Sequence, residues 1–159
     1  MSANAAEVQE DQVGQWVTFR LHDETYGINV MQVQEVLRMS EIAPVPGAPY
    51  YVLGIINLRG NVVTVLDLRR RLNLTSVEPT DQMRILIVET NNISVGLLVD
   101  SIAEVVNLRQ ADIDSPPTVG NDESAKYIQG VSSAEDGLLI LIDLDKLIDA
   151  EMLGTDGLF

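Results

Sequence analysis

The side chains that could carry out acid–base chemistry in this chain are carboxylates. Its 159 residues include 24 Asp and Glu but a single histidine. Asp67 and Asp143 follow similar apolar runs, and a pair of carboxylates can share general acid and base roles in hydrolysis. Each also directly precedes a short segment with helical spacing, where an aspartate caps the first turn. We therefore expect two helix caps, with a small carboxylate-dependent hydrolase as the weaker alternative.

Other catalytic and metal-binding patterns are missing from the sequence. His22 opens a polar turn, where a solvated side chain is expected. There is no nucleophile elbow and no HExxH motif, and the acidic stretch 112–123 lacks the spacing of an EF-hand loop. Without cysteine, the chain has no thiolate ligand and no Cys nucleophile. The sequence predicts a protein that is not an enzyme and that has no cofactor and no metal.

The composition limits the possible partners. The formal charge of −14 disfavours nucleic acid and anionic membrane surfaces, since both are polyanions. An SH3-like nucleic-acid binder is therefore a weak alternative. No apolar run approaches the roughly 20 residues that span a bilayer, so no membrane insertion is expected. Residues 1–13 are acidic and polar without a signal-peptide core, which predicts a disordered tail on a cytoplasmic protein.

Two groups of arginines stand out against this charge. Arg59 lies in the turn Arg59-Gly60-Asn61 between two apolar runs, and Gly and Asn tolerate the positive φ of a hairpin turn. Judged on these residues alone, Arg59 forms a surface ion pair worth about 0–1 kcal/mol, or it reaches a partner. Residues 69–71 are all arginine and fan around a short helix. We expect them to be solvated rather than to clamp a phosphate.

The remainder of the chain alternates short strands with turns. Strands are expected at 16–21, 26–30, 54–58, 62–66, 85–88, 94–99, 105–108, 127–131 and 138–142, and the range 31–39 should form a helical turn followed by a strand. A short helical turn is expected at 50–53. A final helix should follow Asp143, with Leu144, Leu147, Ile148 and Met152 on one face.

The order of these elements repeats. Tyr26-Gly27 matches Val95-Gly96 at an offset of 69 residues, and Leu66-Asp67-Leu68 matches Ile142-Asp143-Leu144 at an offset of 76. Chance similarity between apolar strands is the alternative. Two copies of one unit with about five strands would form two small barrels. The run 138–142 has no polar face, so it should be covered on both sides, with the barrels packed on each other.

The expected domain organisation follows from this repeat. Residues 14–153 would form a single domain of two barrel subdomains, at about 16–75 and 82–148, with the first strand available to either. The extra seven residues of the second copy fall in the polar stretch 112–123, which is expected to be a mobile loop.

Several motifs, in this order and spacing, resemble the CheW family of chemotaxis coupling proteins. They are Tyr26-Gly27-Ile28, Val33-Gln34-Glu35-Val36, Asn57-Leu58-Arg59-Gly60, Val65-Leu66-Asp67-Leu68, Val95 to Asp100 and Leu139 to Asp143. The resemblance covers roughly residues 16–148. It implies the mainly β CheW-like fold, two packed five-stranded SH3-like β-barrels with short helices that include a C-terminal helix. It also implies a non-enzymatic adaptor.

The resemblance further implies partners. The adaptor would couple the cytoplasmic tip of chemoreceptors to the histidine kinase CheA, whose regulatory domain has the same fold. It would also join other copies of itself in receptor arrays. A generic SH3-like scaffold of another two-component pathway is the alternative.

The resemblance also implies a receptor-binding set: Val33, Glu35, Val36, Gly54, Asn57 and Arg59. Arg59 matches an arginine of the family's receptor-facing surface, and the two valines would anchor a receptor helix in an apolar groove between the barrels. Judged on the residues alone, a solvated Glu35 at a strand edge is equally expected.

Overall fold

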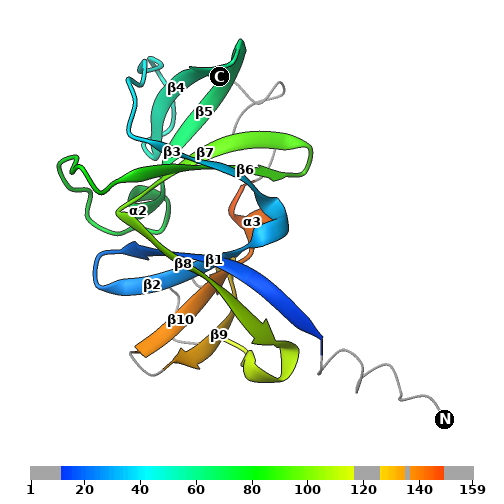
Figure 1. The fold of residues 1–159 in the computed structure, drawn as a ribbon. Coiled ribbons are helices and arrows are strands. Elements are labelled where there is room, and N and C mark those ends of the chain that lie inside the picture. Colours follow the sequence, from blue (N-terminus) through cyan, green and yellow to red (C-terminus); the bar gives the residue numbers. More distant parts are fainter. Residues whose placement is uncertain (1–11, 117–125, 135–136, 149–159) are drawn as a thin grey trace.

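The structure, a computed structural model, describes residues 12–116, 126–134 and 137–148. This part of the chain contains ten strands and two four-residue α-helices (Figure 1). The strands are β1 (Val13–Leu21), β2 (Glu24–Asn29), β3 (Val33–Arg38), β4 (Val52–Leu58), β5 (Asn61–Asp67), β6 (Arg84–Thr90), β7 (Ile93–Val99), β8 (Ser101–Arg109), β9 (Ile128–Ala134) and β10 (Gly137–Ile142). The α-helices are α2 (Leu68–Arg71) and α3 (Leu144–Leu147), and 3₁₀ turns span Val30–Gln32 and Gln110–Asp112.

The strands form two five-stranded sheets. Sheet A has the order β8-β1-β2-β10-β9, and sheet B has the order β3-β6-β7-β5-β4. The mainly β class with two five-stranded units is therefore confirmed. Each sheet takes strands from both halves of the chain, so the expected subdomains at about 16–75 and 82–148 do not coincide with the sheets. A repeat shows which segments are equivalent, but it does not show which copies pair.

The register of the sheets reproduces the repeat. The strand β10 runs parallel to β2 and pairs Ile140 with Tyr26, whereas β5 runs parallel to β7 and pairs Thr64 with Val95. Ile140 and Thr64 differ by 76 residues, and Val95 and Tyr26 differ by 69. The same two offsets occur in the sequence motifs, so the similarity between the two halves reflects a true structural repeat.

Each sheet closes on itself as a small barrel. In sheet B, the backbone of Ala43, in the segment after β3, forms hydrogen bonds of 2.9 and 2.8 Å with Ile55 on β4. In sheet A, Asp114 beyond β8 forms the equivalent bonds of 2.8 and 2.9 Å with Val131 on β9. These bridges join the two end strands of each sheet, and closure removes free sheet edges at these points.

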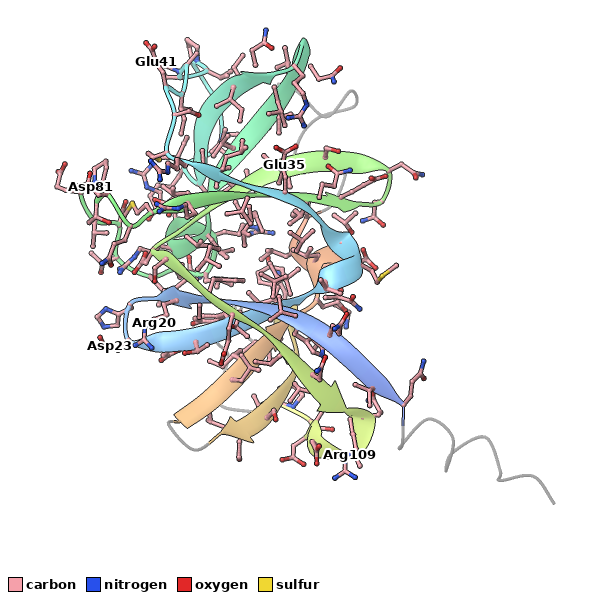
Figure 2. All side chains as sticks on the ribbon, in the orientation of Figure 1. Arg20, Asp23, Glu35, Glu41, Asp81 and Arg109 are labelled. Atoms are coloured by element: carbon pink, nitrogen blue, oxygen red, sulfur yellow. The ribbon has the colours of Figure 1, made fainter. Side chains whose placement is uncertain are left out.

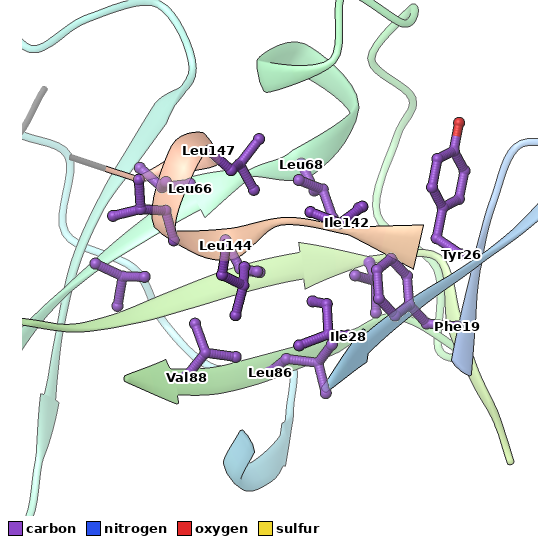
Figure 3. Packing of buried hydrophobic residues seen from close by; sticks show 14 of the residues in the cluster. Phe19, Tyr26, Ile28, Leu66, Leu68, Leu86, Val88, Ile142, Leu144 and Leu147 are labelled. Atoms are coloured by element: carbon purple, nitrogen blue, oxygen red, sulfur yellow. The ribbon is translucent and has the colours of Figure 1, made fainter. Parts of the chain in front are cut away.

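The hydrophobic core has three parts. Side chains of β4 to β7 fill the interior of sheet B, and a smaller cluster around Trp16, Leu139 and Leu141 fills sheet A. The largest cluster lies between the sheets and includes both helices (Figure 3). Its members include Phe19, Ile28, Leu66, Leu68, Leu86, Val88, Ile142, Leu144 and Leu147. Each such burial contributes about 1.5–3 kcal/mol, so the shared core fixes the two barrels against each other.

The strand β10 connects two of these cores. Leu139 and Leu141 point into sheet A, whereas Ile140 and Ile142 contact the shared core. The prediction that this run is covered on both sides is confirmed for these residues. It is wrong for Leu138, which is 55% exposed near the beginning of the strand.

Both short helices begin at the predicted caps. The Asp67 carboxylate accepts a hydrogen bond from the backbone N–H of Arg69 at 3.0 Å, and Asp143 accepts one from Lys146 at 3.3 Å. The predicted helical turn at 50–53 is a tight turn that leads directly into β4. Met152 lies outside the described residues. No helix among the described residues is long and apolar enough to cross a membrane.

The expectation that the three arginines of α2 are solvated is wrong. Arg69 is only 8% exposed, and its guanidinium donates to the Asp100 carboxylate at 2.8 Å and to the Thr75 carbonyl at 2.9 Å. Asp100 also accepts a hydrogen bond from the backbone N–H of His22 in the β1–β2 turn. The ion pair therefore links α2, which directly follows β5 of sheet B, to the β1–β2 turn of sheet A.

Arg71 makes a second link of this kind. Its guanidinium lies between two aromatic rings, 4.8 Å from the centroid of Tyr51 and 4.6 Å from that of Tyr127. It also donates to the carbonyl oxygen of Leu147, at the end of α3, at 3.0 Å. Cation–π contacts and charge-assisted hydrogen bonds thus hold α2 against the segments that flank β9 and β10.

Candidate docking surface

The hairpin that connects β4 and β5 presents Arg59 at its tip. Arg59 and Gly60 both have positive φ angles, 51° and 87°, as a two-residue turn matched to the strand twist requires. The carboxamide of Asn57 accepts a hydrogen bond from the backbone N–H of Gly60 at 2.9 Å. The predicted turn is present. The two residues with positive φ are Arg59 and Gly60 rather than Gly60 and Asn61, because Asn61 already belongs to β5.

Arg59 forms a two-pronged ion pair with Glu35 on β3. The Nη1 atom donates to Oε1 at 3.3 Å, and Nη2 donates to Oε2. The hydrogen bond from Arg59 lowers the pKa of the Glu35 carboxyl below its ordinary value. The Arg59 side chain is 69% exposed and that of Glu35 is 29% exposed, so a partner has access to the pair. The surface ion pair expected for Arg59 is therefore present, and contact of Arg59 with a partner stays a prediction.

A register shift in β3 places Val33 and Val36 on the same face of sheet B. Val33 pairs with Val88 and Val36 pairs with Leu86, with an irregularity between Val33 and Glu35. Both partners belong to the shared core, and directly paired residues share a face. Val33 packs against that core, whereas Val36 is 44% exposed. The two valines therefore border the junction between the barrels.

Sheet A supplies an equivalent border that sequence reasoning missed. Ile102 and Val105 on β8 pair with Phe19 and Val17, which also belong to the shared core. Ile102 packs against the core, and Val105 is 54% exposed. These residues follow the two valines of β3 by 69 positions. The repeat offset is the signal that could have identified them.

A hollow lies where the two barrels meet. It has a volume of about 410 Å³ and is lined by Gln82 in the turn before β6, by Arg84 from sheet B, and by Ser101 and Ile102 from sheet A. One of its walls thus includes a residue of the β8 border. The junction offers a partner both apolar and polar groups.

Gly54 has a different position from the rest of the predicted set. It is buried beside the bridge that closes sheet B, with φ of 150°. A Cβ atom there would lie 2.1 Å from the carbonyl oxygen of Ala43. The contact distance explains why glycine is needed for closure of the barrel, and burial excludes Gly54 from direct contact with a partner.

The groups considered for catalysis do not form one site. Asp67 and Asp143 cap different helices, and Asp67 also accepts a hydrogen bond from the Ser76 hydroxyl at 3.0 Å. The side chain of His22 is largely exposed, as expected. Across residues 12–116, 126–134 and 137–148, no group of three His, Asp or Glu side chains is arranged to hold a metal ion.

Two closed barrels with exposed aliphatic side chains along their junction define a protein-binding scaffold. The family of the CheW-like domain matches residues 15–152. The chemotaxis protein CheW of Treponema pallidum is 35% identical over 147 residues, which cover 90% of this chain and 86% of that protein. The CheW protein of Bacillus subtilis is 36% identical over 135 residues, or 85% of this chain and 86% of that protein.

The fold agrees with a solved member of the same family. The crystal structure of the scaffolding protein TtCheW from Thermoanaerobacter tengcongensis superposes with a TM-score of 0.80 at 32% identity, covering 89% of this chain and 96% of that chain. This chain belongs to the CheW family of chemotaxis scaffold proteins. The predicted adaptor function in chemotaxis signalling, without enzymatic activity, is confirmed.

Proposed function

We propose that this chain binds the cytoplasmic tip of a chemoreceptor along the junction between its barrels and so couples the receptor to the histidine kinase CheA in the cytoplasm. The observation that supports this most directly is the pair of apolar borders. Val33 and Val36 line one side of the shared core, and Ile102 and Val105 line the other. An amphipathic helix laid along such a junction buries its apolar face.

The ion pair at the hairpin tip supplies the polar part of the proposed contact. Glu35 directly precedes Val36 on β3, with its side chain on the opposite face of the strand, and the guanidinium of Arg59 is the more exposed group of the ion pair. Glu35 orients that guanidinium through two hydrogen bonds, which leaves other N–H groups for polar atoms of the receptor. Asn57 contributes by fixing the turn.

The kinase and further copies of the chain would dock at the ends of the barrels. Exposed aliphatic side chains occur there at Val13 near the beginning of β1 and at Leu138 near the beginning of β10. A regulatory domain with the same fold presents comparable strand ends, so barrels would pair end to end. A receptor held at the junction and a kinase held at a barrel end would then communicate through a rigid body.

The test is a binding assay with a chemoreceptor cytoplasmic fragment and CheA. Arg59→Ala and Val36→Asp should each weaken binding of the receptor fragment, Val36→Asp by at least tenfold, and both should leave CheA binding unchanged. Leu138→Asp is the converse variant, because Leu138 is 55% exposed at the barrel end proposed for the kinase: it should weaken CheA binding and leave receptor binding unchanged. Circular dichroism establishes that each variant is folded. Normal receptor binding by folded Val36→Asp would overturn the proposed docking face.

A further inference from the structure

Arg38 and Arg84 face each other across β3 and β6. They form a direct pair in the antiparallel register, at the ends of the two strands. Like charges directly opposite one another destabilise a sheet. Neither arginine forms an ion pair with any described residue. In a chain with a formal charge of −14, two adjacent cations without carboxylate partners call for an explanation.

The fold itself does not need this pair. The repeat offset of 69 residues relates Arg38 to Asn107 and Arg84 to Gln15, and these two residues form the corresponding pair in sheet A. Neutral amides therefore occupy the equivalent positions in the other barrel. A purely structural role would be served equally well by uncharged side chains, so the two positive charges point to a role outside the folding of the sheet.

The arginine pair lies along the proposed docking face. Arg38 and Arg84 continue the row of paired residues that contains Val36 and Leu86, two positions further along the strands. Because side chains alternate, they share the face of the shared core. Arg84 also lines the 410 Å³ hollow beside Ile102 of sheet A. The apolar border on β3 is thus followed by two cations, Arg38 on β3 and Arg84 on the neighbouring β6.

The surroundings of the pair leave room for an anion. Both arginines line a second hollow of about 570 Å³, together with Met39, Pro79, Thr80 and Asp81. Arg84 is positioned by hydrogen bonds of 2.8 Å to the backbone carbonyls of Asp81 and Met83. Asp81, on the loop that leads into β6 (Figure 2), is the one carboxylate among the residues that line this hollow. The lining therefore carries a net positive charge.

We propose that the helix docked along the junction carries an acidic side chain that binds between Arg38 and Arg84, one helical turn beyond its apolar anchors. This inference rests on the proposed function and adds a charge requirement to it. Val36 and Arg38 are about 7 Å apart along the strand, and residues i and i+4 of a helix are about 6 Å apart along its axis. A carboxylate four residues from an apolar anchor therefore reaches the guanidinium groups, which bind planar carboxylates in two-pronged geometry.

The experiment uses two synthetic amphipathic helical peptides that are identical except at one position. Both carry leucines at i, i+3 and i+7, and the residue four positions after the last leucine is Glu in one peptide and Gln in the other. The wild-type chain should bind the Glu peptide about five- to tenfold more tightly at low salt, as expected for a charge-assisted contact at a partly exposed site. The preference should shrink as salt is raised.

The variant R38Q/R84Q replaces both arginines with neutral amides, the type of side chain at the equivalent positions of sheet A, and should bind the two peptides equally. R20Q/R109Q removes the same charge elsewhere in the chain and should keep the preference for Glu. The thermal midpoint of R38Q/R84Q should stay close to that of the wild type, because the repulsion that is removed offsets the two hydrogen bonds that Arg84 donates to backbone carbonyls. A folded R38Q/R84Q variant that keeps the preference, or a wild type without it, would overturn the inference.

The failures of the inference and of the proposed function are distinguishable. If the wild type binds both peptides equally and Val36→Asp binds neither, the proposed role of the arginine pair is refuted and the proposed docking face is supported. If the wild type binds neither peptide and does not bind the chemoreceptor fragment, the proposed docking face is refuted, and the charge requirement that rests on it is refuted too.

Discussion

Glu35 and Arg59, 24 residues apart in the sequence, form a two-pronged ion pair between β3 and the β4–β5 turn. The pair ties the apolar border of β3 to the hairpin tip. Both charged side chains stay accessible to solvent, Arg59 at 69% and Glu35 at 29% exposure. The strength of the ion pair depends on the ionised state of Glu35, which makes the pair accessible to titration.

Glu35 should stay ionised to a lower pH than an ordinary glutamate. The hydrogen bond from Arg59 lowers the pKa of Glu35 in the folded state. A lowered folded-state pKa stabilises the protein above the unfolded-state pKa, and this contribution is lost as the pH falls through the folded-state value. Titration of the Glu35 side-chain carboxyl by NMR should show a pKa below the usual glutamate value, and Arg59→Ala should restore it. An unchanged pKa in Arg59→Ala would contradict the assignment.

The hairpin at residues 57–61 could be read from the sequence because its signals are local. Apolar β-branched runs, a Gly in the turn and an Asp before the following helix specify the element with no knowledge of the remaining fold. The repeat was also readable, since its two offsets preserve the register of both parallel pairings. The exchange of strands between the two copies cannot be predicted from the sequence. Whether a strand pairs within its own copy or with the other copy depends on which long-range pairs bury the shared core.

The arginines of α2 show the second limit. A run of three arginines in an acidic chain suggests solvent exposure, and position on a helix says nothing about the neighbouring barrel. Arg69 is buried because the parallel pairing of β5 with β7, which sets Asp67 opposite Leu98, also brings Asp100 within reach of its guanidinium. Gly54 is similar, since the need for glycine arises from Ala43 on a distant segment.

Loss of the Asp100 carboxylate should destabilise the protein. Burial alone would raise the pKa of Asp100, but hydrogen bonds from Arg69 and from the His22 N–H lower it below the ordinary value. Asp100→Asn leaves the buried Arg69 guanidinium without its counter-ion, which costs about 2–4 kcal/mol for a pair that is mostly buried. Urea unfolding measures this change in the free energy of unfolding.

The control for that experiment is Asp112→Asn. Asp112 pairs with Arg109 at 3.3 Å, but both side chains are solvent-exposed. An exposed pair contributes about 0–1 kcal/mol, so the midpoint should barely move. Equal effects of Asp100→Asn and Asp112→Asn would show that the link between α2 and the β1–β2 turn does not stabilise the packed barrels.

Closure of sheet B should fail when Gly54 acquires a side chain. The Cβ of Gly54→Ala would lie 2.1 Å from the Ala43 carbonyl oxygen, which accepts the closing hydrogen bond from Ile55. Displacing that backbone costs about 3 kcal/mol or more. Gly14→Ala is the control, because its nearest neighbour, Trp16 Nε1, lies at an ordinary 3.5 Å. Thermal unfolding of Gly54→Ala at the midpoint of Gly14→Ala would contradict this account of closure.

The two helix caps should differ in their contribution to stability even though the repeat makes them equivalent. Asp67 is buried, accepts from the Arg69 N–H and also accepts from the Ser76 hydroxyl. Asp143 accepts a longer bond, from Lys146. Removal of a cap costs about 0.5–2 kcal/mol, and Asp67→Ala also leaves the Ser76 hydroxyl without this partner. Chemical unfolding should therefore place Asp67→Ala near or above the upper end of that range and Asp143→Ala near the lower end, and the reverse order would show that burial does not set the strength of these caps.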